Sequence, residues 1–345
     1  MIKHLIKQPY FGILLSATIA GIVLIFLFFM PNVRSVEGSE AFYVPTGTST
    51  VTMIEQLDKE DRLVSHFTFS LLSKILLTDK EAKAGKYILP SGMNNLKLIL
   101  ILRSGRQTPV SLTFNNVRLA EELAGKISFY IEPDSQSVLT KMKDPVFCAQ
   151  FGLDTFNIMS LFIPNTYQIY WNTSVEKFFG KMEEEHKKFW KMDNREAKAD
   201  SLGLSKAEVY TLASIVEKET LINSEKPDVA GVYLNRLNKG MRLQADPTVV
   251  FATRNWELKR VLHGHLTFES PYNTYMNKGL PPGPICMPEI SSIDAVLNAT
   301  FHDYIYFCAK PGGDGAHAFA STFEEHLQLA KIYRQWVDKL EAQNQ

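Results

Sequence analysis

Two glutamates, Glu217 and Glu219, lie in a stretch that the sequence predicts to be a buried helix. Ser205 and Glu208 have the spacing of a capping box, in which a serine begins a helix and a glutamate three residues later completes the cap. The helix is therefore expected over about residues 206–221, with apolar residues on more than one face. An ionised carboxylate is costly in a buried helix unless something compensates its charge. These two glutamates are therefore the first candidates for acid–base chemistry.

Helical geometry separates the two carboxyls and favours Glu217. Residues two positions apart point about 200° away from each other around the helix axis, so they cannot form an acid–base pair. Glu217 shares its face with Tyr210, Ala213 and Ser214, whose small or polar side chains leave room for a ligand. A carboxyl in an apolar cleft holds its proton more tightly, as a general acid near neutral pH must. Glu217 is therefore the predicted catalytic residue.

A structural role for Glu217 is the alternative. Buried carboxylates commonly form ion pairs, and Arg236 and Arg242 are the candidate partners in this sequence. The helix alone does not decide between the two interpretations.

Two polar loops follow the helix and supply candidate ligand contacts. In residues 243–248, Asp246 is expected to be the N-cap of another helix, which leaves Gln244 and Thr248 as hydrogen-bond donors. Residues 270–284 are rich in aromatic, amide and proline residues, and such a loop suits sugars through stacking and hydrogen bonds. A proline-stiffened structural loop is the alternative interpretation.

Other familiar site motifs are absent or incomplete. The glycine-rich segment 312–315 lacks the Lys-Ser/Thr pair of a P-loop and is interpreted as a hairpin turn that presents His317. His263 and His265 have no acidic or cysteine partner at metal-ligand spacing, which favours surface histidines over zinc. The motifs of serine hydrolases, zincins and dinucleotide-binding proteins do not occur. Basic and acidic residues number 37 each, so no overall charge recruits nucleic acid.

The three cysteines do not form a recognisable framework. Cys148, Cys286 and Cys308 are too few and too irregularly spaced for a disulfide scaffold or a zinc site. A bridge between Cys286 and Cys308 and buried free thiols are both open alternatives.

The N-terminal segment predicts a membrane anchor. Residues 11–30 contain no charge, and about 20 apolar residues are what a helix needs to cross a bilayer. Small residues of a cleavage site do not follow, which favours an anchor over a cleaved signal peptide. Lys3 and Lys7 precede the segment, so residues 1–10 are expected to be cytoplasmic and the bulk of the chain to lie outside.

The rest of the chain is long enough for two modest domains. Residues 40–115 alternate short strands with helices and predict a small α+β domain, in which Gly105 ends a helix. Residues 116–203 are interpreted as a connecting and supporting helical region, which includes a charged amphipathic helix over 173–198. Residues 204–345 form the predicted catalytic domain.

The motifs around Glu217 resemble a known family. The matching segments are Ala213–Thr220, Val232–Leu237, Met241–Thr248, Tyr272–Tyr275 and Gly279–Pro284, and they closely resemble the endolytic murein transglycosylases, the YceG-like or MltG family. Residues 84–87 and 102–105 resemble the smaller LysM-like domain of that family. The resemblance covers nearly the whole chain after the anchor.

The resemblance implies non-hydrolytic cleavage of the β-1,4 bond between N-acetylmuramic acid and N-acetylglucosamine in nascent peptidoglycan, which leaves 1,6-anhydro-muramyl ends and terminates strand elongation. The family's catalytic glutamate is taken to correspond to Glu217, which would act first as acid and then as base. The implied substrate-binding residues are Gln244, Thr248, Tyr272, Asn273, Thr274, Tyr275, His317 and Phe319. The implied supporting residues are Ser214, Asn235, Arg236, Asp246 and Pro282.

The resemblance also implies architecture and partners. Both domains are expected to be α+β, and the catalytic domain is not expected to be lysozyme-like. The expected location is the inner membrane, with one span and a periplasmic catalytic domain. No cofactor, metal or nucleic acid is expected; glycan strands are the expected partner, and cell-wall synthases are candidate partners. A non-catalytic, glycan-binding scaffold for such synthases is the alternative function.

Two positions depart from the family pattern. Asn165 stands where members often have an acidic residue, and Ala320 stands where some have asparagine. The substrate contacts of the family are therefore not carried over to these two positions.

Overall fold

The computed structural model describes residues 9–34, 40–258 and 260–343. The described chain is mixed α+β, with three two-stranded sheets. It divides into two compact units: residues 1–111 with 130–132 and 168–174, and residues 112–129, 133–167 and 175–345. The expected cytoplasmic segment 1–10 lies mostly outside the described residues.

The first unit begins with the apolar helix α2 (Pro9–Phe29). Residues 11–29 are long and apolar enough to cross a membrane, and this stretch is unburied by the rest of the chain. The elements that follow are β1 (Ala41–Val44), α3 (Thr50–Lys59), α4 (His66–Leu76), β2 (Gly85–Ile88) and α5 (Asn95–Ser104). Strand β3 (Val110–Thr113) begins in this unit and continues into the second. The antiparallel pair β1–β2 and the flanking helices enclose a core that includes Phe42, Phe69, Tyr87 and Leu98. The expected helix stop at Gly105 is confirmed, with a left-handed φ of 67°.

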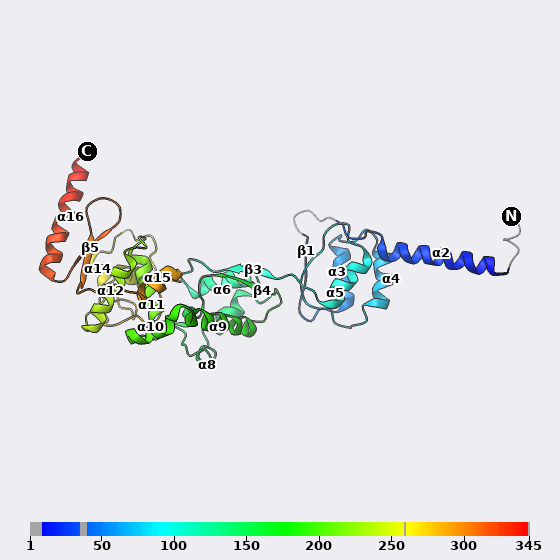
Figure 1. Cartoon of the computed structure of the whole chain (residues 1–345), viewed down its shortest axis with the longest axis horizontal. Coiled ribbons are helices and arrows are strands. Elements are labelled where there is room, and N and C mark those ends of the chain that lie inside the picture. Colours follow the sequence, from blue (N-terminus) through cyan, green and yellow to red (C-terminus); the bar gives the residue numbers. More distant parts are fainter. Residues whose placement is uncertain (1–8, 35–39, 259, 344–345) are drawn as a thin grey trace. The chain divides into compact units, whose positions relative to one another are not determined.

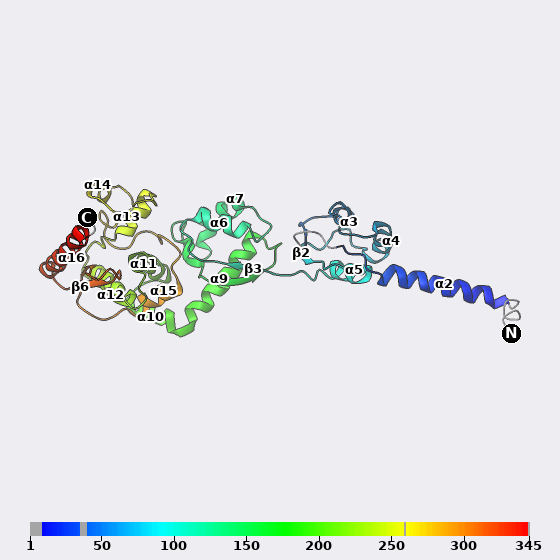
Figure 2. The ribbon, with the colours of Figure 1, turned by 90° about the horizontal axis from the view of Figure 1, so that it is seen from above.

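The second unit is mainly helical (Figures 1 and 2). Its first half contains α6 (Ala120–Ser128), α7 (Ser135–Met142), α8 (Pro145–Ala149), η1 (Ile158–Leu161), β4 (Thr166–Ile169), α9 (Val175–Lys191), η2 (Met192–Asn194) and α10 (Arg195–Leu202). Its second half contains α11 (Lys206–Glu219), α12 (Lys226–Asn238), α13 (Asp246–Thr253), α14 (His263–Leu266), α15 (Ile290–Leu297), β5 (Tyr306–Ala309), β6 (His317–Ala320) and α16 (Phe323–Gln343). Strand β3 pairs with β4, and β5 pairs with β6. The single helix expected over 173–198 is instead interrupted, because Asp193 and Asn194 adopt positive φ angles.

Helix α11 is the central element of the second unit. The predicted capping box is confirmed: the Ser205 hydroxyl accepts from the Glu208 amide, and the Glu208 carboxylate accepts from the Ser205 amide. All residues from Val209 to Val216 are buried, because α12, α13 and α15 pack around the helix. The helix ends at Glu219, two residues before the predicted end, so Glu219 occupies its last position.

The structure corrects one further prediction and decides between two open alternatives. Asp246 is the first residue of α13, and the N-cap is Ala245, so the Asp246 side chain is free to contact another segment. The cysteines at 148, 286 and 308 are all free thiols, so the Cys286–Cys308 bridge does not form. The expected hairpin turn before His317 is confirmed by the antiparallel pairing of β5 with β6.

Candidate active site

Glu217 is part of a buried ion pair. Its Oε2 atom lies 3.0 Å from the Nζ atom of Lys226, and the Ser292 hydroxyl donates a hydrogen bond to the same oxygen. The Lys226 side chain is only 4% exposed and that of Glu217 16%. The ion pair considered as the alternative for Glu217 is present, and its partner is a lysine of α12, not one of the two candidate arginines. The pair does not decide whether Glu217 also has the predicted catalytic role. The expected apolar cleft around this carboxyl is wrong, because an ammonium and a hydroxyl contact it.

Glu219 has a different environment at the end of α11. Its Oε1 atom accepts a 2.6 Å hydrogen bond from the Tyr233 hydroxyl of α12. Desolvation by burial raises the pKa of Glu219 to about 7, and the nearby charge of Asp246 acts in the same direction. The Tyr233 hydrogen bond opposes the shift because it stabilises the ionised form. A carboxyl with this pKa can both give and accept a proton near neutral pH.

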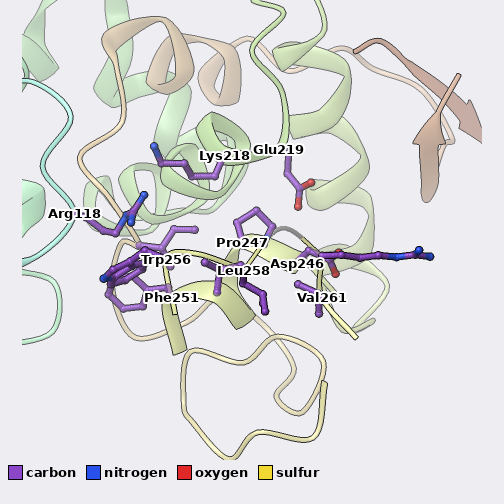
Figure 3. A pocket seen from close by; sticks show the side chains of 12 residues that line it. Arg118, Lys218, Glu219, Asp246, Pro247, Phe251, Trp256, Leu258 and Val261 are labelled. Atoms are coloured by element: carbon purple, nitrogen blue, oxygen red, sulfur yellow. The ribbon is translucent and has the colours of Figure 1, made fainter. Parts of the chain in front are cut away.

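The Glu219 carboxyl lines a pocket with a volume of about 400 Å³. Figure 3 shows this carboxyl beside Pro247 and Asp246 at the start of α13. The pocket combines two acidic, three basic and two aromatic side chains with apolar ones. The lining residues are Arg118, Lys218, Glu219, Asp246, Pro247, Val250, Phe251, Trp256, Leu258, Arg260, Val261 and Ile285. The Arg118 guanidinium lies 4.2 Å from the centre of the Trp256 ring, an arrangement that holds both groups at the pocket wall.

Three predicted substrate contacts instead hold the loops together. The hydroxyls of Thr248 and Thr274 are 2.8 Å apart, and Thr248 also donates to the carbonyl of Ala245. Asn273 is fully buried, and its amide donates to the carbonyls of Leu266 and Phe268. Buried polar groups need such partners, so these side chains fix the loops and do not line the pocket.

The other predicted loop residues lie near the pocket or at the surface. The Tyr275 hydroxyl donates a 2.6 Å hydrogen bond to Asp246, and the Tyr272 ring packs on Phe251, 4.7 Å between ring centres. Both tyrosines therefore support lining residues. Gln244 is exposed and has a left-handed φ of 52°.

The predicted supporting residues of α11 and α12 hold neighbouring segments. The Ser214 hydroxyl accepts from the Ile285 amide and so fixes the loop that carries Ile285 into the pocket wall. Arg236 donates to the carbonyls of Leu243 and Ile305, and Asn235 donates to those of His302 and Tyr304. These contacts tie α12 to the loop before the pocket helix α13 and to the segment that leads into the hairpin.

The remaining predicted residues lie away from the lining of this pocket. His317 begins β6, where its Nδ1 atom is 3.0 Å from Glu225, and Phe319 stacks with Tyr304. Pro282 lines a separate pocket beside α11. Asn165 accepts a hydrogen bond from its own neighbour, Thr166, through its side chain.

Sequence reasoning missed several lining residues. Lys218 stands between the two glutamates. Phe251, near the end of α13, and Trp256, just after that helix, form an aromatic pair, so the sequence held a usable signal for these three residues. Arg118 lies about one hundred positions before α11, and no local pattern connects it with the site. No group of three potential metal ligands occurs among the residues that the structure describes.

Gly283 is a position where the loop tolerates no side chain. A Cβ atom at this residue would lie 2.0 Å from the carbonyl oxygen of Phe156. The Gly283→Ala variant is therefore expected to lose about 1–3 kcal/mol of stability through overpacking, measured by thermal unfolding. Gly125→Ala in α6 is the matched control, because a Cβ there meets nothing within 4 Å. Equal stability of both variants would contradict the tight packing of this loop.

Comparison with known proteins gives a consistent result. The model of the YceG-like family matches residues 42–332. The endolytic murein transglycosylase of Bacillus subtilis is 30% identical over 309 residues, which cover 84% of this chain and 83% of the relative. The enzyme of the same name from Streptococcus pneumoniae R6 is 26% identical, and the match covers 82% of this chain but only 56% of the longer relative.

A solved structure is also similar. The 2.6 Å crystal structure of a YceG-like protein from Listeria monocytogenes has a TM-score of 0.54 and 28% identity, and it covers 84% of this chain and 98% of that chain. The family match spans most of the sequence, including both compact units and the glutamates of α11. This chain therefore belongs to the YceG-like family.

Proposed function

We propose that this chain is an endolytic murein transglycosylase that cleaves the β-1,4 bond between N-acetylmuramic acid and N-acetylglucosamine and leaves a 1,6-anhydro-muramyl end. The names of its relatives support the reaction class. The observation that carries the proposal is the Glu219 carboxyl, which lines a pocket and has a pKa of about 7. The resemblance to the family gives the catalytic role to Glu217. This proposal departs from that assignment and gives the role of acid and base to Glu219, and variants of the two glutamates test the choice.

The contacts of the two glutamates are the reason for this choice. Glu217 has its carboxylate occupied by Lys226 and Ser292. Glu219 keeps one hydrogen bond from a neutral donor, Tyr233, and its carboxyl borders the pocket. Only the second arrangement places the carboxyl at the wall of this pocket.

The chemistry needs one carboxyl. Protonated Glu219 gives its proton to the glycosidic oxygen as the bond from C1 of the muramyl residue to that oxygen breaks. The Glu219 carboxylate then takes the proton of the muramyl 6-hydroxyl, whose oxygen bonds to C1. The glycosidase mechanisms that use water need a second carboxyl as nucleophile or base. In this proposal Asp246, held by Tyr275, stabilises positive charge that develops at the sugar ring.

The basic and aromatic residues of the pocket suit a murein strand. Trp256 and Phe251 offer apolar surfaces on which sugar rings stack. Muramyl residues carry carboxylates on the lactyl group and stem peptide, which Arg118, Lys218 and Arg260 can pair with. We assign these three cations to binding of the substrate's acidic groups.

The product ends decide the reaction. Glycan strands incubated with the full chain in detergent should yield anhydro-muramyl ends, identified by mass spectrometry. Reducing ends would mean that the chain is a muramidase. Unchanged strands with a folded protein that binds them would favour the alternative, a non-catalytic scaffold for cell-wall synthases.

The rate should depend on pH through Glu219. The reaction begins with the protonated carboxyl, so the active form predominates below the pKa of about 7 and is lost as the pH rises through it. A plot of log kcat/KM against pH is expected to be level at about pH 6 and to fall with unit slope above about pH 7. A profile that instead rises between these pH values would contradict protonated Glu219 as the starting form.

Tyr233 is expected to be a positioning residue. Its hydroxyl stabilises the ionised form of Glu219, so Tyr233→Phe should raise the pKa of Glu219 further and move the alkaline limb of the pH profile to higher pH. The maximal rate should fall by about 10-fold, because the carboxyl loses the group that orients it. Tyr306→Phe, on strand β5, serves as the control. An unshifted limb in Tyr233→Phe would exclude this role.

The architecture of the family completes the proposal. The first unit, with its strand–helix–helix–strand order, is proposed to be LysM-like, and the second unit is proposed to be a catalytic domain unlike lysozyme.

Helix α2 is proposed to be a single inner-membrane span with the catalytic domain in the periplasm. Protease added to intact spheroplasts should digest most of the chain, and full protection would refute this topology. Association with cell-wall synthases would be measured by co-purification.

A further inference from the structure

An apolar ridge runs along helix α4 in the first unit. Phe67, Leu71 and Ile75 follow one another at four-residue intervals, so they lie on one face of the helix. They are 74%, 42% and 66% exposed, and Val64, just before the helix, is 55% exposed. We call these four residues the α4 ridge. Leu100 of α5, a helix that packs against α4, is also half exposed. A contiguous apolar surface of this kind indicates an interaction site.

The α4 ridge begins at the end of helix α2. Helix α2 packs against both α4 and α5, as both views show (Figures 1 and 2). The Asn95 amide of α5 donates a 2.8 Å hydrogen bond to the carbonyl of Leu27. Asn32 accepts from the amide of Ser65, the N-cap of α4, and donates to its carbonyl. The span therefore joins the first unit without a flexible linker.

The length of the span sets the depth of this junction. Residues 11–29 form a helix of 19 residues, which at about 1.5 Å per residue just covers a hydrocarbon core of about 30 Å. Leu27 and Phe28 belong to the span and also pack against the core of the first unit. The parts of α4 and α5 beside them must then lie at the surface of the bilayer.

We propose that the α4 ridge inserts into the headgroup and acyl boundary of the bilayer leaflet from which the first unit emerges. The inference rests on α2 being a membrane span. Continuity with α2 identifies lipid as the occupant. The amide of Val64, the first ridge residue, donates a 2.8 Å hydrogen bond to the carbonyl of Asn32, just after the end of the span at Phe29. The polar ionisable side chains of α4 are His66, whose Nδ1 atom lies 3.2 Å from Asp58, and Lys74, whose long stem lets its ammonium reach the headgroups. The first unit is then held against the membrane by two elements.

Spin labels on the full chain in lipid nanodiscs test this arrangement. The three native cysteines are replaced by alanine, and a nitroxide is placed at Phe67→Cys, Leu71→Cys or Ile75→Cys. Accessibility to oxygen and to a water-soluble nickel chelate then reports the depth of each label. The ridge labels are expected about 5–10 Å below the headgroup surface, the depth typical of interfacial helices. Val51→Cys is the matched control, because it is 65% exposed on α3, which lies farther from α2 (Figures 1 and 2).

A second control distinguishes a failure of the ridge proposal from a failure of α2 to span the membrane. A label at Ile19→Cys, inside the span, should lie deep in lipid. Ridge labels that contact the nickel chelate as freely as the Val51 label, while the Ile19 label is in lipid, would overturn the inference and leave the anchor intact. An Ile19 label in water would overturn both. Ridge labels shielded from both reagents, with spin–spin broadening, would show a second copy of the chain on the ridge and also overturn the inference.

Discussion

Replacing Glu219 with glutamine should lower the rate of glycan cleavage by about 10²–10⁴-fold, the usual contribution of a positioned general acid–base group. The amide has nearly the shape of the carboxyl and can still accept the Tyr233 hydrogen bond, so the pocket should remain intact. It can neither release a proton to the glycosidic oxygen nor take one from the muramyl 6-hydroxyl. The measurement is the yield of anhydro-muramyl ends from isolated strands, with binding of the strands measured in parallel.

The matched control removes the other glutamate of α11. Glu217→Gln alone would leave the Lys226 ammonium without a charged partner. The control is therefore the double variant Glu217→Gln/Lys226→Met, in which neither charge remains. It is expected to cleave within about 10-fold of the natural chain, because it changes no group placed next to the reacting atoms. Full activity in Glu219→Gln, together with inactivity of a folded double variant, would return the catalytic role to Glu217.

Much of the framework of the site follows from the sequence. The capping box of Ser205 and Glu208 gives the start of α11 because its hydrogen bonds are local. The opposite orientation of Glu217 and Glu219 follows from the helical repeat, and the structure gives the two carboxyls separate partners. The hairpin of β5 and β6 follows from its glycine-rich turn. Each of these features depends on interactions between residues that are close together in the sequence.

The choice between the two glutamates could not be made in this way. It depends on α12, which places Lys226 beside Glu217 and Tyr233 beside Glu219. A buried lysine at the start of a helix has no local signature, and neither candidate arginine reaches Glu217: Arg236 instead donates to backbone carbonyls. Long-range packing therefore decides which carboxyl is ion-paired and which lines the pocket.

The loop residues show the same limit of prediction from local sequence. Residues 272–275 form a motif whose residue types suit a sugar, but the two central residues and the two tyrosines have different roles in the structure. Asn273 and Thr274 are buried and hold the loop, whereas Tyr275 reaches Asp246. Residue type gives the capacity for hydrogen bonds, and only the fold decides whether the partner is a ligand or the protein's own backbone.

Breaking the ion pair of Glu217 should have the largest effect on stability. Glu217→Gln leaves the ammonium of Lys226, whose side chain is 4% exposed, without a charged partner. Removing one member of a buried pair typically costs about 3–5 kcal/mol. Lys226→Met should cost less, because Glu217 keeps the hydroxyl of Ser292 and some access to water. Thermal unfolding would report the loss, at roughly 2–4 °C per kcal/mol for a unit of this size.

The double variant completes the cycle. Because Glu217→Gln/Lys226→Met leaves no unpaired charge, it should be more stable than Glu217→Gln alone, with a coupling energy of about 0.5–3 kcal/mol between the two positions. Additive effects of the two substitutions would show that the pair is not coupled, and that Glu217 has a role outside the fold. A coupled pair would instead explain why an ion-paired glutamate stands two positions before Glu219, the proposed catalytic residue. It fixes the first turn of α12 to the last turn of α11, and α12 carries the Tyr233 hydroxyl that orients Glu219.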